Sequence, residues 1–379
     1  MKKFIPLFFI IFIGFNLFSQ KQIIDSIPFT LKTKVLTFKG KINGIETNFA
    51  FDTGATIGVL TSKQADNSKI QSTKNKKVTD SNQQKTSMEQ TTIDEITIGS
   101  FTINDSKSVV YDMPFLACNE NFLLGGNVIN QLNWKFDFDK KLVYVSKDAF
   151  SASSEMISFP VKFKSERHFT DFSLDNKTFS NCLIDFGYTG IFEISEEDKI
   201  IKNIEKENKQ SSKTVFGEKY TMGLSSGTTS NYAAFTVESF AIGSKNFKNL
   251  QVQTKLVTDK KIGLKFFTNY CSQVIINSGE KKYYLKLSNK NIDNDLGLEA
   301  DYYWKNNKLT VVGKLKNTQN TSDNLQVNEE IKTVNGKKAT DFTDECEFIK
   351  WKVENSDLQE ITIVKMDDTV LIIKRQSLN

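Results

Sequence analysis

The sequence predicts a mainly β protein with two β lobes in tandem, followed by a smaller third domain. Most segments have the residue pattern of short strands, the first half of the chain recurs in the second, and the composition changes after Ser288. The chain has 379 residues, which is too long for one ordinary hydrophobic core. We therefore expect lobes at 28–150 and 155–288 and a further domain at 295–379.

Strand patterns are found along most of the chain. Alternating apolar and polar residues, or β-branched runs, predict strands at 33–45, 47–51, 93–103 and 142–145. Asn43-Gly44 is a strong signal for a two-residue hairpin turn. Helical patterns are few, and we expect helices at 128–132, 196–208 and 344–353.

The internal repeat consists of three pairs of short motifs in the same order. Phe49-Ala50-Phe51-Asp52-Thr53-Gly54 returns as Cys182-Leu183-Ile184-Asp185-Phe186-Gly187. Two weaker pairs follow, which are Ile98-Gly99-Ser100 with Ile242-Gly243-Ser244, and Leu124-Gly125 with Ile262-Gly263. Their common order and similar offsets indicate a duplicated β unit with its boundary near the polar stretch 148–155.

The N-terminal segment has the pattern of a secretory leader. Lys2 and Lys3 precede an apolar run at 4–18, which is followed by Ser19-Gln20. The run is shorter than the roughly 20 residues that span a bilayer, and Pro6 interrupts it. We expect residues 1–20 to be a cleaved signal peptide and the mature protein to be periplasmic or extracellular, without a transmembrane anchor. The alternative is that the segment remains as a membrane anchor.

Charge and composition argue against several functions. The net charge of +5 falls by two when Lys2 and Lys3 are removed, and so small an excess does not suggest a nucleic-acid binder. The single histidine, His168, lies in a polar stretch, and we expect it to be exposed in a loop and not catalytic.

The spacing of the cysteines matches no zinc motif, so we expect neither a metal nor a cofactor. In an oxidising compartment these four residues allow three full disulfide pairings: Cys118, Cys182, Cys271 and Cys346.

Asp52-Thr53-Gly54 follows an apolar strand and suits a particular chemistry. The strand places the carboxylate at a tight turn that Gly54 permits, and Thr53 offers a hydroxyl that can brace a neighbouring loop. Two such turns face to face hold two carboxyls about 3 Å apart, so the pair shares one proton. One carboxylate then acts as a general base on water, and the other carboxyl protonates the substrate carbonyl oxygen.

Residues 33–145 resemble the retropepsin-like aspartic protease family. The resemblance rests on the apolar strand before Asp52-Thr53-Gly54-Ala55, the Leu124-Gly125 turn, the helix at 128–132 and Trp134-Lys135-Phe136-Asp137. It implies that Asp52 is catalytic, that Thr53, Gly54 and Ala55 shape its loop, and that the substrate is a peptide or unfolded polypeptide. Because the unit is repeated, the chain is similar to pepsin-like enzymes, which carry two acid-protease β-barrel lobes. Flap hairpins are then expected within 78–98 and 215–240.

The second half-site departs from the family pattern. The repeat makes Asp185 the partner of Asp52, with Gly187 and Thr189 supporting its loop. Phe186 stands where the family has a bracing Thr or Ser, and Tyr188 is bulkier than the usual Ala or Ser. Two interpretations stay open. Either the pair works with a modified brace, or the second lobe keeps the fold without efficient chemistry.

The segment from 295 to 379 resembles a PDZ domain. Residues 325–331, followed by Val334-Asn335-Gly336-Lys337, are similar to the PDZ pattern, with Asn328-Glu329 in place of the usual Gly-Asp. The resemblance implies that the helix at 344–353 lies beside a peptide groove. It also implies that Leu296-Gly297-Leu298 forms the loop whose backbone N–H groups meet the carboxylate of a C-terminal peptide. The alternative is a PDZ-shaped packing domain without a ligand.

Two functions are therefore weighed. The first is an aspartic endopeptidase that acts between Asp52 and Asp185, with a PDZ-like module that recruits the polypeptide. The second is a peptide-binding protein of the same fold without efficient hydrolysis. The separation of the two carboxyls discriminates between them, because a shared-proton pair requires about 3–4 Å.

Overall fold

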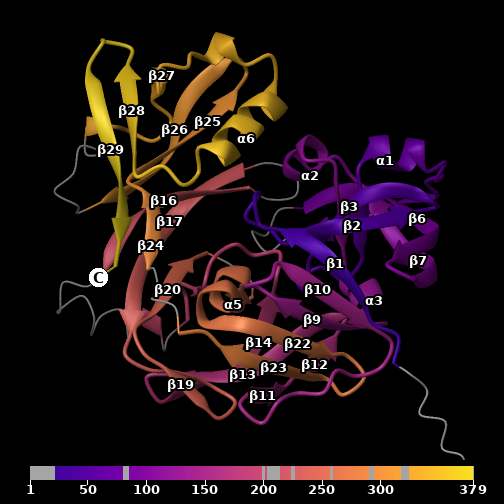
Figure 1. The fold of residues 1–379 in the computed structure, drawn as a ribbon. Helices are drawn as coiled ribbons and strands as arrows, with labels where there is room; N and C mark the ends of the chain where they lie inside the picture. Colours follow the sequence, from indigo (N-terminus) through magenta and orange to yellow (C-terminus); the bar gives the residue numbers. More distant parts are fainter. Residues whose placement is uncertain are drawn as a thin grey trace, which may run out of the picture.

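The computed structural model describes residues 22–79, 85–198, 201–202, 214–222, 227–256, 259–289, 294–316 and 324–378. The protein is mainly β, with two lobes and a C-terminal module that lies beside both of them (Figure 1). The expected signal peptide and most of the expected helix at 196–208 fall outside the described residues. None of the described helices is both long and apolar enough to cross a membrane.

The first lobe contains a closed six-stranded barrel. Strands β2, β3, β8, β4, β7 and β6 pair in that order, and pairing between β2 and β6 closes the ring. The elements of this lobe are β1 (Asp25–Thr30), β2 (Thr37–Ile42), β3 (Ile45–Phe51), β4 (Gly58–Leu60), α1 (Ser62–Asn67), β5 (Lys74–Thr79), β6 (Lys85–Ile98), β7 (Phe101–Val110), α2 (Pro114–Cys118), β8 (Asn121–Leu124), α3 (Gly126–Ile129), β9 (Asn133–Asp137) and β10 (Leu142–Ser146).

Two turns in this lobe test the strand predictions. Asn43 and Gly44 have φ of 47° and 79°, the left-handed values that a tight hairpin turn requires, so the predicted turn is confirmed. The single strand expected at 93–103 is wrong. The chain turns at Gly99-Ser100, where Gly99 has φ of 59°, and two paired strands result.

The second lobe repeats the strand pairing of the first. In the first lobe Phe51 pairs in parallel with Leu124, and in the second Ile184 pairs in parallel with Ile262. Gly243 has φ of 58° and lies at the turn that corresponds to Gly99. The elements are β11 (Ile157–Pro160), β12 (Lys162–Lys164), β13 (Arg167–Leu174), β14 (Lys177–Asp185), β15 (Phe192–Ser195), β16 (Val215–Met222), β17 (Gly227–Val237), β18 (Phe240–Ile242), β19 (Lys245–Phe247), β20 (Leu250–Lys255), β21 (Lys261–Gly263), α5 (Leu264–Tyr270), β22 (Cys271–Asn277) and β23 (Lys282–Leu287).

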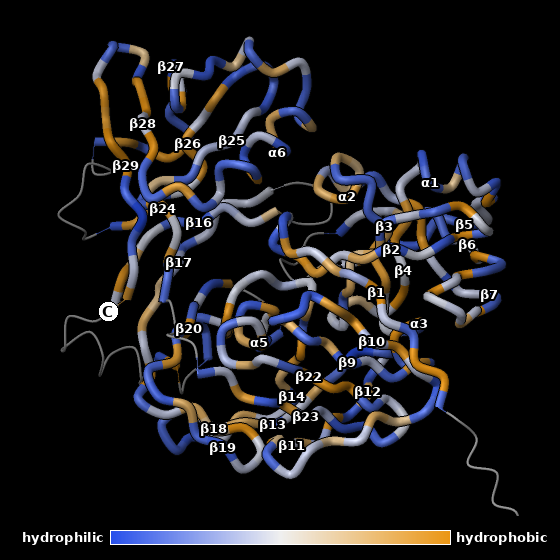
Figure 2. Tube along the Cα trace, viewed as in Figure 1, coloured by the Kyte–Doolittle hydropathy of each residue, from blue (hydrophilic) through white to orange (hydrophobic). Residues whose placement is uncertain are grey.

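A shared sheet joins the two lobes. Strand β9 of the first lobe pairs with β22 of the second, in a sheet ordered β11-β23-β22-β9-β10-β1 (Figure 1). Its buried aromatic side chains belong to one hydrophobic core that runs through both lobes and includes Trp134, Phe136 and Tyr283. Apolar residues lie mainly along the strands and polar residues along many outer turns (Figure 2). The common core fixes the position of one lobe relative to the other.

The expected exposure of His168 is wrong. The side chain is fully buried on β13, where its Nδ1 lies 2.6 Å from the Tyr283 hydroxyl and its Nε2 lies 2.5 Å from Oδ1 of Asn130. Because that amide oxygen can only accept, Nε2 carries the proton and Nδ1 accepts from Tyr283. Burial lowers the pKa of His168 to about 3. The polar residues around His168 in the sequence suggested an exposed loop, whereas the side chain has a structural role between the two lobes.

The C-terminal module extends the sheet of the second lobe. Strand β26 pairs with β16, so the β16–β17 hairpin lies between the second lobe and the module. Helix α6 begins after Asp344, which caps the backbone N–H of Glu347, and the prediction at 344–353 is confirmed. The elements are β24 (Asp295–Leu298), β25 (Ala300–Lys305), β26 (Lys308–Lys316), β27 (Glu330–Val334), the 3₁₀ helix η2 (Ala339–Asp341), α6 (Glu345–Glu354), β28 (Glu360–Lys365) and β29 (Val370–Ser377).

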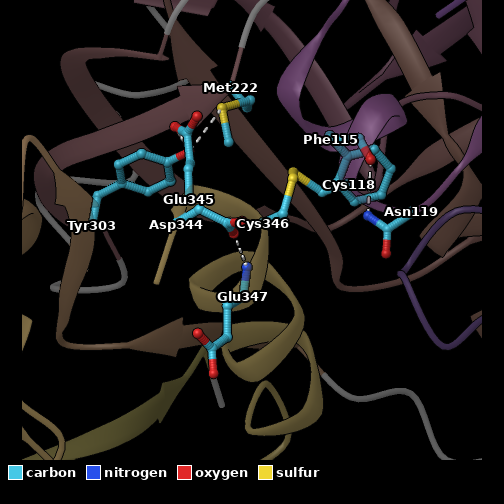
Figure 3. The surroundings of a disulfide bond; sticks show 9 residues. All are labelled: Phe115, Cys118, Asn119, Met222, Tyr303, Asp344, Glu345, Cys346 and Glu347. Atoms are coloured by element: carbon cyan, nitrogen blue, oxygen red, sulfur yellow. Dashed lines mark hydrogen bonds between the residues drawn. A yellow bond between two sulfur atoms is a disulfide. The ribbon is translucent and has the colours of Figure 1, made fainter. Parts of the chain in front are cut away.

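A disulfide joins this module to the first lobe. Cys118 at the end of α2 is bonded to Cys346 in α6, and the two residues are 228 positions apart in the chain (Figure 3). Cys182 and Cys271 are buried free thiols. None of the three full pairings that the sequence allowed is therefore formed, and the single disulfide connects the first lobe to the C-terminal module.

Candidate active site

Two loops present the predicted catalytic aspartates. Asp52 follows β3, whose last residues are buried, and its carboxylate accepts hydrogen bonds from the backbone N–H groups of Gly54 and Ala55 at 2.7 and 3.1 Å. Asp185 ends β14 and accepts from the N–H of Tyr188 at 3.0 Å. Each loop therefore orients its own carboxylate through backbone donors.

The two loops face each other closely. A Cβ atom added to Gly54 would lie 2.5 Å from the carboxyl carbon of Asp185, and one added to Gly187 would lie 2.5 Å from that of Asp52. Neither position has room for a side chain. Glycine at both is therefore required by the approach of the opposite aspartate, and the two side chains also hydrogen-bond to each other.

The aspartate pair holds a proton at neutral pH. Burial raises the pKa of Asp52, the charge of Asp185 raises it further, and the pKa reaches about 8. The hydrogen bonds from Gly54 and Ala55 act in the opposite direction but do not offset these effects. A pair with one proton and one negative charge is the state that acid–base activation of water needs.

Half of the expected loop brace is present. The Thr53 hydroxyl is fully buried, donates to the carbonyl oxygen of Ile184 at 2.6 Å and accepts from the N–H of Phe186 at 3.1 Å. Phe186 cannot return these bonds. Its ring instead stacks on Phe267 at 4.7 Å and packs against Phe51 at 5.5 Å. Hydroxyl bracing on one side is thus combined with aromatic packing on the other.

Thr189 does not replace the missing hydroxyl, because it is exposed in the cleft while Thr53 makes both bracing bonds. The bulky Tyr188 fits by turning toward β20, where its hydroxyl donates to Oε1 of Gln253 at 3.2 Å. Its backbone carbonyl accepts from the N–H of Leu264 at the start of α5. The atypical residues of this loop therefore have defined positions.

Three buried charged residues at the site were missed by sequence reasoning. Lys261 on β21 places Nζ 3.7 Å from Oδ2 of Asp185 and 3.5 Å from Oε1 of Glu193 on β15. Lys255 on β20 approaches the other Glu193 oxygen at 3.2 Å. One signal was available: Lys261 lies two residues before the repeated Gly263, where the first lobe has Leu123 before Gly125.

One cleft connects the aspartate pair with the C-terminal module. Its volume is about 1430 Å³, and it is lined by both aspartates and by Leu296, Gly297 and Leu298. The hairpins β5–β6 and β16–β17 contribute to its walls, as expected of flaps. Across the described parts of the chain, no three metal-binding side chains gather in one group.

The two main walls of this cleft differ in polarity. On the first lobe, Val59 pairs with both Val109 and Leu123. At the corresponding positions of the second lobe, Glu193 pairs with both Gln253 and Lys261. All six side chains line the cleft. A bound chain would therefore meet an apolar surface on one side and a charged surface on the other.

Comparison with known proteins agrees with the first half-site. Residues 38–128 match the family model described as aspartyl protease. The solved structure of an aspartic proteinase from Irpex lacteus resembles this chain with a TM-score of 0.44 and 12% sequence identity, over 70% of this chain and 98% of that one. No curated protein matches the chain. The part of the chain that contains Asp52 is thus similar to the aspartyl protease family.

Proposed function

We propose that the chain is an exported aspartic endopeptidase that hydrolyses peptide bonds in peptides or unfolded polypeptides. The observation that carries this proposal is the meeting of Asp52 and Asp185 across tightly packed glycines at one cleft. The match of residues 38–128 to aspartyl proteases supports it independently. Export is proposed from the leader pattern at 1–20, and the final compartment is periplasmic or extracellular.

The chemistry follows from one proton and one charge on the pair. The ionised carboxylate takes a proton from water while the water oxygen bonds to the peptide carbonyl carbon, and the protonated carboxyl gives its proton to the carbonyl oxygen. The tetrahedral diol then collapses. Its C–N bond breaks as the carboxyl that took the proton from water gives it to the leaving nitrogen, and the other carboxylate takes a proton from a diol hydroxyl, so the pair returns to its starting arrangement of one proton.

The C-terminal module is proposed to recruit or position the polypeptide in the manner of a PDZ domain. The turn Asn335-Gly336 follows β27, and Asn328, which stands where glycine is usual, has the left-handed φ of 71° that such a position requires. The loop predicted at 296–298 is instead part of strand β24, which pairs with β29, and this segment shares the cleft with the aspartates. A chain held by the module would thus lie near the site of cleavage.

A second candidate is a peptide-binding protein that does not hydrolyse efficiently. Phe186 favours it, because half of the hydroxyl brace is missing. It predicts that peptides bind in the cleft with their bonds intact.

The test is proteolysis of an unfolded-protein substrate and a peptide library by the wild type, Asp52→Asn and Asp185→Asn. We expect either substitution to abolish cleavage, because the remaining carboxyl cannot act as both acid and base. Asp105→Asn, at an exposed position within β7 of the first lobe, is the matched control and keeps full activity. Equal turnover by the wild type and Asp52→Asn would reject the proposal. Peptide binding without cleavage by the wild type would favour the second candidate.

A further inference from the structure

The duplicated lobes differ at one cross-strand position beside the aspartates. In the first lobe Val59 lies opposite Leu123, and in the second Glu193 lies opposite Lys261. The topology around the two pairs is the same. The first residue of each pair follows the half-site loop of its lobe, and the second precedes the glycine at the start of α3 or α5. An apolar pair is thus a workable solution at this position of the fold. Packing alone therefore does not explain why the second lobe has a charged pair at this position.

The charged pair directly contacts one of the two aspartates. Lys261 is 5% exposed and Glu193 is 2% exposed, and the Lys261 ammonium lies 3.7 Å from Asp185. Among the ion pairs of the described residues, none includes Asp52. Burying charges is costly, and it is tolerated where opposite charges lie close. Lys261 therefore makes the two halves of the pair electrostatically unequal.

We propose that Lys261 is a positioning residue for the aspartate pair: its ammonium group holds the negative charge on Asp185 and leaves the shared proton on Asp52. The inference rests on the proposed function, and it assigns the two roles. Asp185 is the base that takes a proton from water, and Asp52 is the acid that protonates the substrate carbonyl oxygen.

The buried charges balance when the aspartate pair carries a single negative charge. Lys255 and Lys261 carry two positive charges, and Glu193 with a singly ionised pair carries two negative ones. Burial by itself lowers the pKa of Lys261, but the charges of Glu193 and Asp185 reverse this effect and raise it, so the ammonium persists.

Other charged and titratable groups face this cluster from neighbouring elements. Lys219 on β16 contacts Gln253, and burial, followed by the charge of Lys255, lowers the pKa of Lys219 to about 8. Asp259, which acts on Lys261, is paired with Arg167 at 3.0 Å. The hydroxyls of Tyr188 and Tyr232 stay protonated, because burial, followed by the charge of Glu193, raises the pKa of each. Within the described residues, Lys261 is the cation paired with an aspartate of the site.

The first experiment locates the proton without using activity. Aspartate labelled with ¹³C at Cγ reports the protonation of each carboxyl, and the resonances are assigned by their loss in Asp52→Asn and Asp185→Asn. We expect wild type near pH 6 to show Asp52 protonated and Asp185 ionised. In Lys261→Met this difference shrinks or reverses, and in Lys261→Arg it is restored. The same difference in Lys261→Met as in wild type would overturn the inference.

The second experiment uses the acidic limb of the pH profile of kcat/KM. Lys261 favours the first ionisation of the pair, so Lys261→Met should move this limb upward by about 1 pH unit or more. Glu193→Gln removes a negative charge from the same cluster and should move the limb downward. Lys261→Arg should leave it near the wild-type position. Limbs that coincide in all three variants would contradict the inference.

A matched double variant guards against misfolding. Lys261→Leu with Glu193→Val installs the pair that the first lobe already uses and leaves no glutamate opposite an apolar residue. Because it removes one charge of each sign, its acidic limb should lie between those of Lys261→Met and Glu193→Gln. Wild type that fails to cleave, yet shows a Lys261-dependent proton position, would count against the proposed function alone. Wild type that cleaves, with a proton position independent of Lys261, would count against this inference alone.

Discussion

Thr53 is the residue on which the geometry of both half-sites depends. Its hydroxyl alone makes the two bonds that hold the Asp185 loop to the Asp52 loop. Thr53→Val would leave the carbonyl of Ile184 and the N–H of Phe186 buried without partners. We expect a loss of about 1–3 kcal/mol in the free energy of unfolding, measured by urea denaturation. Thr53→Ser keeps the hydroxyl and should lose much less, so equal losses in the two variants would show that the bonds contribute little.

Asp52 should also make stability depend on pH. Burial first and Asp185 second raise its pKa from the model-compound value of 3.8 to about 8 in the folded protein. A group with a raised folded pKa contributes stability that is fully present below its unfolded pKa and is lost as pH rises through the folded value. We expect the unfolding free energy of wild type to fall between pH 5 and 8 relative to that of Asp52→Asn. Parallel curves for the two proteins would contradict this expectation.

At the scale of elements, α6 and β25 decide whether the C-terminal module can take a peptide. Lys352 of α6 donates to the carbonyl of Tyr302 at 2.7 Å and to Asp301 at 2.6 Å. A peptide that adds as a strand beside β25 must displace this lysine. In the proposed PDZ-like role, Lys352 would therefore be an internal competitor of the peptide.

Lys352→Ala should tighten the binding of peptides with a free C-terminal carboxylate. Removal of one competing hydrogen bond of about 1 kcal/mol corresponds to roughly five-fold in Kd. Fluorescence anisotropy with a C-terminal peptide library measures the change, and Lys350→Ala, on the exposed side of the same helix, serves as the control. If neither wild type nor Lys352→Ala binds any peptide, the module is a packing domain.

Elements with a local signal were predictable from the sequence, whereas long-range contacts were not. The Asn43-Gly44 turn and the capped α6 follow from neighbouring residues, and the repeat led to the correspondence of Asp52 with Asp185. The burial of His168 depends on Tyr283, which is 115 positions away, and no local pattern reports such a partner. Lys261 was missed for a related reason. A lysine is predicted to lie at the surface unless its partners, here Glu193 and Asp185, are known.

At the scale of the whole molecule, the C-terminal module is connected to both lobes. The pairing of β16 with β26 and the disulfide between Cys118 and Cys346 are two of these connections. The sheet connection fixes the module to the second lobe, and the disulfide fixes it to the first. The cleft therefore has three walls whose positions are coupled.

Replacing both Cys118 and Cys346 by serine should weaken this coupling. A disulfide of this kind contributes about 2–4 kcal/mol. In differential scanning calorimetry we expect the double variant to unfold at lower temperature, with a separate transition for the C-terminal module. Cys271→Ala, which replaces a buried free thiol, is the control and should keep the wild-type number of transitions. A double variant with the wild-type thermogram would show that sheet pairing alone holds the module.

The pair of Glu193 and Lys261 has a consequence for how such a site evolves. Both lobes are encoded in one gene, so a codon change alters one half-site and leaves the other intact. In a site assembled from two identical subunits, a lysine in place of Leu123 would appear beside both aspartates at once. A single chain with two lobes is free of that restriction. Here one half-site combines Asp-Thr-Gly-Ala with an apolar wall, and the other has a charged pair beside its aspartate.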